Sequence, residues 1–141
     1  MNPVPTGDDF DDMHHALGRP DGRHVQPYRN RYCTDTDGST ARRFEALGLW
    51  RRIGLINAGA MAMFEVNERG RELLMAWLDE KNRSAGVRAW AVGGGGVTER
   101  IVMARTRSAA RYDVYLSISD VYHFDGGFRG FLALGVRARA A

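Results

Sequence analysis

The stretch MAMFEVNERGRELL, residues 61–74, decides how the first half of the chain folds. Its apolar residues alternate with others up to Val66, which predicts a strand with Phe64 and Val66 on one face. Asn67 is a favoured N-cap residue, and the apolar side chains beyond it recur at helical spacing. We therefore expect a strand that ends at Val66 and a helix that Asn67 caps, running to about Lys81.

A helix and a second strand are expected before this stretch. Residues 39–48 predict a helix, because they begin with two good N-cap residues and end at a glycine suited to a C-cap. Residues 49–56 predict a strand, and residues 57–59 predict a turn into the returning strand of residues 60–66. Helix, hairpin and helix in this order are typical of a winged-helix-like module, which we expect over residues 13–82.

A second, smaller module is expected over residues 83–141. Residues 81–86 have the composition of a linker and mark the boundary. Two β-prone runs, residues 87–92 and 97–104, flank four glycines, and this pattern predicts a hairpin with a loose turn.

The rest of the second module changes its period. Apolar residues recur at helical spacing from a cap at Ser108. Residues 125–131 are rich in glycine and predict a break, and residues 132–140 predict a last strand. The order is therefore β-β-α-β, and the fold class predicted for the whole chain is α+β.

The N-terminal residues fit the winged-helix pattern poorly. Residues 1–12 are acidic and contain proline, unlike a secretory signal, and predict a flexible acidic lead. Residues 13–39 are short and rich in turn residues, so they do not supply the further helices that a helix-turn-helix needs. Two interpretations of the hairpin stay open: it belongs to a DNA-reading unit, or it only packs on a helix.

The composition is that of a folded protein rather than a disordered or membrane-spanning one. Of the 141 residues, 44% are hydrophobic and 26% are charged. No apolar run approaches the roughly 18 residues that a membrane span requires. Cys33 is the only cysteine, so no internal disulfide can form, and a reducing cytosol is the expected location.

Charge is divided unevenly along the chain. Residues 1–82 carry eleven basic side chains against thirteen acidic ones, a net charge of −2. Residues 83–141 carry nine arginines against four acids, a net charge of +5. Lys81 is the only lysine, and the guanidinium group of arginine is the better one for forked contacts with phosphate or carboxylate. A solvated basic face is the alternative explanation.

In the first module, the winged-helix comparison identifies five candidate binding residues. Thr40, Arg42 and Arg43 lie in the first turn of the predicted helix, whose end reaches bases and phosphates in DNA-binding proteins. Arg51 and Arg52 would flank the groove from the following strand. The predicted wing tip carries neither lysine nor arginine, which counts against DNA reading.

A second basic cluster lies in the second module. Arg105, Arg107 and Arg111 occupy the predicted junction between a strand and a helix N-terminus, and Arg137 and Arg139 lie on the last strand. Free backbone N–H groups and arginines together suit an anion. The same segment carries three tyrosines, namely Tyr112, Tyr115 and Tyr122. Tyrosines can stack on bases, but at helical spacing they more often pack in or near a core.

The histidines and the single cysteine are the candidate metal ligands and catalytic groups of the sequence. His14, His15, His24 and Cys33 fall within twenty residues, but their spacing matches no structural zinc pattern. No nucleophile with an orienting base and no phosphate-binding loop is present as a motif. The sequence therefore predicts a non-catalytic protein with no metal and no cofactor.

Several short motifs resemble a group of small proteins encoded by bacteriophages and prophages of GC-rich bacteria. They are HHALGR (14–19) followed by YRNRY (28–32), FEVNERGRELL (64–74), and ARTRSAARYDVYLSISD (104–120). The resemblance implies an accessory phage product, located in the cytoplasm of the bacterial host. It carries over no catalytic residues.

Two functions follow as hypotheses. The first is a non-catalytic phage protein that binds nucleic acid through its arginine-rich surfaces. The second is an inhibitor of host defence, of the anti-CRISPR type, that binds a host protein or nucleoprotein and blocks its DNA-binding surface. Neither hypothesis involves a membrane, and association into a homodimer is compatible with both. A metal-dependent hydrolase built on the histidines is a distant third.

Overall fold

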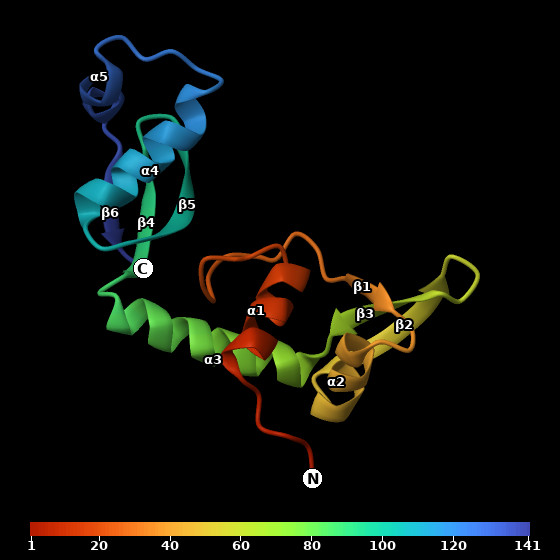
Figure 1. Ribbon diagram of the computed structural model, residues 1–141. Coiled ribbons are helices and arrows are strands. Elements are labelled where there is room, and N and C mark those ends of the chain that lie inside the picture. The colour runs from red at the N-terminus through yellow and green to blue at the C-terminus, as the bar shows by residue number, and fades with distance from the viewer. The chain divides into compact units, whose positions relative to one another are not determined.

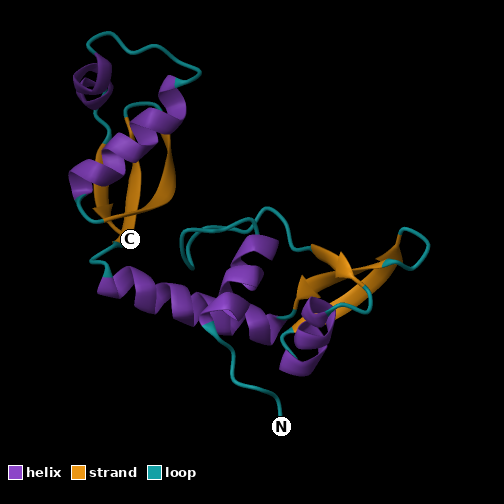
Figure 2. Ribbon diagram, in the orientation of Figure 1, coloured by secondary structure: helices purple, strands orange, loops and turns teal.

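The computed structural model describes all 141 residues and divides into two compact units. Unit 1 is Met1–Leu78 and unit 2 is Asp79–Ala141, so the helix that begins at Glu68 crosses the boundary. Each unit combines helices with one three-stranded antiparallel sheet (Figures 1 and 2). The predicted α+β class is therefore confirmed.

Unit 1 is built around a sheet with the strand order β1-β3-β2. The strand β3 pairs with both neighbours, and a bulge interrupts the β2 pairing between Arg52 and Gly54. The elements are α1 (Gly7–Ala16), β1 (Tyr32–Asp35), α2 (Ser39–Leu47), β2 (Trp50–Ile56), β3 (Met61–Val66) and α3 (Glu68–Ser84).

The core of unit 1 lies on one face of this sheet. Burial alternates along β3, where Ala62, Phe64 and Val66 are buried. The three helices pack their apolar side chains on that face. The Phe44 ring stacks on Trp50 with 3.9 Å between the ring centroids. The alternation read from the sequence is therefore the alternation of the folded strand.

Asn67 joins three elements at the end of β3. Its side-chain oxygen accepts a hydrogen bond of 2.9 Å from the Gly70 N–H, and its amide nitrogen donates one of 3.0 Å to the Gly48 carbonyl. Its own N–H donates to the Leu49 carbonyl at 3.0 Å. One side chain thus caps α3 and holds the residues before β2. This explains why β3 can pass directly into α3 with Asn67 as the only residue between them.

The side-chain amide of Asn30 holds the loop before β1 to the end of β3. The Asn30 side chain donates to the Val66 carbonyl at 2.9 Å and accepts from the Val66 N–H at 2.8 Å. These two bonds imitate strand pairing at the place where β1 has not yet begun. They satisfy both backbone groups of a buried residue.

The prediction of a flexible acidic lead over residues 1–12 is wrong. Gly7–Ala16 forms α1, which the Thr6 hydroxyl caps while the Asp9 carboxylate accepts from the Thr6 N–H. This reciprocal pair is a capping box. Acidic side chains in the first turn also interact favourably with the positive end of the helix dipole. The acidic composition, read as a sign of flexibility, is in fact a helix start.

No helix-turn-helix is formed by α1 and α2. A loop and the strand β1 separate the two helices, and α2 is the only helix between β1 and β2. A helix-turn-helix joins consecutive helices by a short turn, and that arrangement is missing here. The tip of the β2–β3 hairpin is a turn in which Asn57, Ala58 and Gly59 all have positive φ.

Unit 2 has a sheet with the strand order β5-β4-β6, covered on one face by helices. The predicted loose turn is a tight one: Gly95 and Gly96 connect β4 to β5 with φ angles of 61° and 86°, which suit a two-residue hairpin turn. The elements are β4 (Arg88–Gly94), β5 (Val97–Ala104), α4 (Arg107–Ser119), α5 (Gly127–Ala133) and β6 (Arg137–Ala140).

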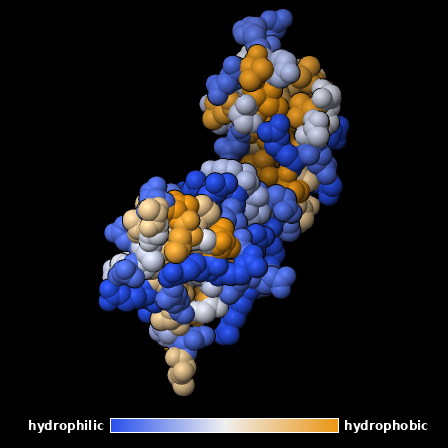
Figure 3. Space-filling model, turned by 90° about the vertical axis from the view of Figure 1, so that its right-hand side faces the viewer, coloured by the Kyte–Doolittle hydropathy of each residue, from blue (hydrophilic) through white to orange (hydrophobic).

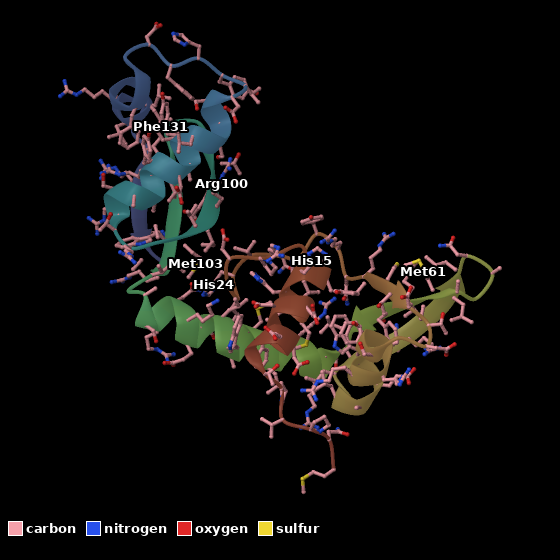
Figure 4. The ribbon with its side chains drawn as sticks, in the orientation of Figure 1. His15, His24, Met61, Arg100, Met103 and Phe131 are labelled. Atoms are coloured by element: carbon pink, nitrogen blue, oxygen red, sulfur yellow. The ribbon has the colours of Figure 1, made fainter.

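Unit 2 contains one helix more than the predicted β-β-α-β order. Residues 125–131, predicted to be a break, contain most of α5, and β6 begins only at Arg137. Phe131 is fully buried and lies between α5 and α4, with its ring centroid 5.6 Å from that of Tyr115 (Figure 4). Packing of this phenylalanine stabilises a helix that its glycines alone do not favour. Unit 2 is therefore β-β-α-α-β.

Candidate anion-binding site

Arg43, a predicted binding residue of unit 1, is committed to a structural ion pair. Its guanidinium holds the Asp9 carboxylate in a forked contact, with Nε–Oδ1 of 3.0 Å and Nη2–Oδ2 of 2.6 Å. The Asp9 side chain is only 6% exposed. The hydrogen bonds from Arg43 are the main reason that the pKa of Asp9 is lowered, although burial alone would raise it.

The other predicted arginines of unit 1 also have partners within the chain. Arg51 pairs with Glu65, and Arg52 pairs with Glu45. The Arg42 guanidinium donates to the Asp37 carbonyl at 2.6 Å. An arginine already paired with a carboxylate must give up that contact to bind phosphate, so these positions are weak anion sites.

Thr40 lies in an acidic environment rather than a basic one. It lines a hollow of about 560 Å³ in which three carboxylates, those of Asp8, Asp9 and Asp12, outnumber the single guanidinium of Arg43. Burial, and then the negative charge of Asp9, raise the pKa of Asp12. This hollow has the wrong sign of charge for a phosphate group.

The predicted arginines of unit 2 form a different arrangement. Arg107 and Arg111 lie one turn apart on α4, and with Arg137 of β6 they line a hollow of about 380 Å³. We call this site the basic hollow. Arg105 lies in the exposed connection before α4 and does not line it. The structure thus brings two of the three predicted residues together and adds a third from the last strand.

None of the arginines around the basic hollow forms an ion pair with a carboxylate. The Nε atom of Arg111 is buried and has no hydrogen-bond partner. The Arg107 guanidinium lies 5.7 Å from the centroid of the Trp90 ring, over which Arg88 also stacks at 4.8 Å. A buried donor without a partner is costly, so an anion that accepts from it would be stabilised.

The N-terminal end of α4 adds to the positive potential at the basic hollow. Thr106 caps the helix by accepting from the Ala109 N–H at 3.0 Å, and Arg107 is the first helical residue. The first N–H groups of a helix lack partners within it and carry partial positive charge. An acceptor that reaches Arg107 therefore also lies near the favourable end of the helix dipole.

The sequence interpretation names Arg137 beside the second basic cluster, together with Arg139, but does not select it as a binding residue. The two arginines are two residues apart on one strand, so they face the same side of the sheet and neither spacing nor alternation distinguishes them. Their positions along β6 separate them: Arg137 lines the basic hollow, whereas Arg139 reaches Glu99.

The predicted tyrosines have different surroundings. Tyr115 packs among the rings of Phe124, Phe128 and Phe131, and Tyr112 meets Phe128 edge to face. Tyr122 is 63% exposed and has no ring neighbour. Two tyrosines are therefore packing residues, and one presents its ring to solvent.

His14, His15, His24 and Cys33 lie in unit 1, and His15 and His24 are labelled in Figure 4. The His14 ring hydrogen-bonds the Pro20 carbonyl at 2.7 Å, and His15 meets Tyr32 edge to face. Cys33 is half-buried on β1. No group of three histidine, cysteine or carboxylate side chains is placed so that it could hold a metal ion.

Comparison with protein families, with curated proteins and with solved structures gives no match to this chain. None of its helices combines the length and the apolar character needed to cross a membrane.

Proposed function

We propose that this protein is a non-catalytic phage-encoded accessory protein that binds nucleic acid through unit 2. The observation that carries the proposal is the basic hollow, where Arg107, Arg111 and Arg137 converge without any carboxylate partner. Nucleic acid is a polyanion whose phosphates accept forked hydrogen bonds from guanidinium groups. The phage origin rests on the sequence resemblance alone.

The contrast between the units supports this choice of surface. Residues 83–141 carry a net charge of +5, while the arginines expected to bind in unit 1 contact carboxylates or a carbonyl. Long-range attraction of a polyanion depends on the net charge of the surface that it approaches. Unit 2 therefore offers both the attraction and the unpaired donors.

Replacing Arg107, Arg111 and Arg137 together by alanine should weaken nucleic-acid binding and make it less sensitive to salt. Each phosphate contact contributes about 0.9 to the slope of log K against log salt, so losing three should reduce the slope by about 2 to 3. Fluorescence anisotropy of a labelled oligonucleotide over a salt series measures both quantities.

The matched control for this experiment is the double variant Arg51→Ala/Arg52→Ala, which also removes arginines but only paired ones. It should retain nearly the wild-type slope. Circular dichroism and thermal unfolding of each variant check that it is folded. An unchanged slope in the triple variant, or an equal loss in the control, contradicts the proposed surface.

The alternative function is inhibition of a host nucleoprotein, of the anti-CRISPR type, by covering its DNA-binding surface. The acidic hollow favours it, because its carboxylates Asp8 and Asp12, unlike Asp9, are not paired with Arg43 and can occupy a surface that normally receives phosphates. Capture of purified CRISPR effector complexes is the test. Capture that survives the arginine triple variant but is lost in Asp8→Asn/Asp12→Asn would favour inhibition over direct nucleic-acid binding.

A further inference from the structure

Unit 2 has a second hollow beside the basic one. The connection between α5 and β6 separates them: Gly135 lines the basic hollow, and Leu134 lines the second. The second hollow measures about 480 Å³. We call it the aromatic hollow, because its lining includes Tyr122, His123 and Phe124.

The ring of Tyr122 is the accessible part of this hollow. The side chain is 63% exposed, and Leu134 opposite is 48% exposed. Phe124, by contrast, meets the buried Phe131 edge to face at 5.2 Å, so it is anchored to the core of unit 2. Apolar areas are visible on the surface of this unit in Figure 3. An exposed ring beside an anchored one is a platform on which a flat ligand can stack.

Arg100 places a positive charge at the same hollow. It points from β5 toward α4, where its Nη1 donates to the Ser117 hydroxyl at 3.1 Å (Figure 4). It forms no ion pair. A cation next to an exposed ring suits a ligand that is flat, partly apolar and attached to an anion, and a nucleotide has these three properties.

The wall between the hollows is held in place by the β4–β5 turn. A Cβ built at Gly95 would lie 2.1 Å from the Leu134 carbonyl oxygen, so the turn packs directly against the connection. Only glycine allows this approach, at a residue whose φ is also positive. The two hollows are therefore set by one rigid contact rather than by two independent loops.

We propose that the aromatic hollow receives a nucleobase of a single-stranded nucleic acid whose phosphates bind at the basic hollow. The inference rests on the proposed function and makes it more specific. In a duplex the bases are paired and stacked, so a face is free for Tyr122 only in a single strand. The protein should therefore prefer a single strand to a duplex of the same sequence.

The test compares three labelled ligands by fluorescence anisotropy: a single-stranded oligonucleotide, an abasic strand of the same length, and the duplex. The wild-type protein should bind the single strand most tightly. Tyr122→Ala should weaken that binding about 5- to 150-fold, the range found when a stacking ring is removed, while leaving abasic binding unchanged. Tyr112→Ala removes a tyrosine that is 45% exposed and lies outside the hollow, and it should have little effect on single-strand binding.

The outcomes separate this inference from the proposed function. Equal affinity for normal and abasic strands would overturn the base site while leaving phosphate binding intact. If the protein binds none of the three ligands, both the base site and the proposed nucleic-acid function are overturned. If Tyr122→Ala is not folded, NMR of the wild-type protein decides the question. The amide signals of Tyr122 and His123 should then shift with the normal strand and not with the abasic one.

Discussion

Replacing Gly70 by alanine is expected to destabilise unit 1 by about 1 to 3 kcal/mol, the usual cost of overpacking a filled core. Gly70 is a buried residue of α3, at the place where this helix crosses the start of β2. A Cβ there would lie 2.5 Å from the Leu49 carbonyl oxygen and 2.7 Å from a Val66 methyl carbon. The carbonyl belongs to the backbone and cannot rotate away, so the helix or the strand must shift.

Helix propensity predicts the opposite sign for this substitution. Alanine is favoured over glycine in a helix interior by about 1 kcal/mol. The experiment therefore decides between local preference and close packing. Urea unfolding, followed by tryptophan fluorescence to which the buried Trp50 of unit 1 contributes, measures the change in the free energy of unfolding.

Gly7→Ala is the matched control for the Gly70 substitution. Gly7 also lies in a helix, but a Cβ there would have no neighbour within 4 Å. This variant should be neutral or slightly more stable than the wild type, because propensity then acts alone. A Gly70→Ala protein as stable as the wild type would show that α3 does not pack on β2 as described.

Removing the guanidinium from Arg43 should clearly destabilise unit 1. Breaking a buried ion pair from one side leaves the other charge without its partner, and Arg43 is partly open to water, which reduces the penalty. Its side chain is 35% exposed, whereas Asp9 is 6% exposed. Arg43→Ala therefore leaves a buried carboxylate that keeps only its bonds from Thr6.

The double variant Asp9→Asn/Arg43→Met tests the origin of this cost. It removes both charges, so no unpaired carboxylate is left in the core. It should be more stable than Arg43→Ala, as measured by urea unfolding. The opposite order would mean that the attraction between the two charges, rather than the burial of one, dominates at this site.

The same pair should give unit 1 part of its dependence on pH. The pKa of Asp9 is lowered in the folded protein, so its contribution to stability is complete above about pH 5 and is lost as the pH falls through the folded value. The pKa of Asp12 is raised, so its contribution has the opposite sign and offsets part of the loss. The difference in unfolding free energy between about pH 7 and about pH 3 should be smaller in Asp9→Asn.

Arg43 variants are consequently poor probes of binding. A loss of nucleic-acid affinity in Arg43→Ala would report the release of α1 from α2 rather than a lost phosphate contact. The basic hollow offers a cleaner comparison, because replacing its three arginines leaves no buried carboxylate without a partner.

The elements that were predicted correctly are those with a local signal. The alternation up to Val66 and the cap at Asn67 are properties of adjacent residues, and both appear in the fold as expected. The helix α1 also had a local signal, since Thr6 and Asp9 have the spacing of a capping box. Acidic composition is ambiguous here, because it is typical both of flexible segments and of the first turn of a helix.

The remaining features depend on contacts between distant residues. Asp9 and Arg43 are 34 positions apart, so no spacing rule identifies them as partners. The helix α5 depends on the burial of Phe131 against α4, which outweighs its glycines. The third arginine of the basic hollow comes from β6, and its place follows from the strand order rather than from the chain order.

The stacking of Arg107 on Trp90 gives unit 2 an optical property. Trp90 is 7% exposed, and its indole N–H donates to the Ala104 carbonyl at 3.1 Å, so its emission depends on a fixed protein environment. One guanidinium lies both over this ring and at the basic hollow. Occupation of the hollow therefore changes the electric field at the indole, so Trp90 adds a part that depends on binding to the tryptophan emission, to which Trp50 and Trp77 also contribute.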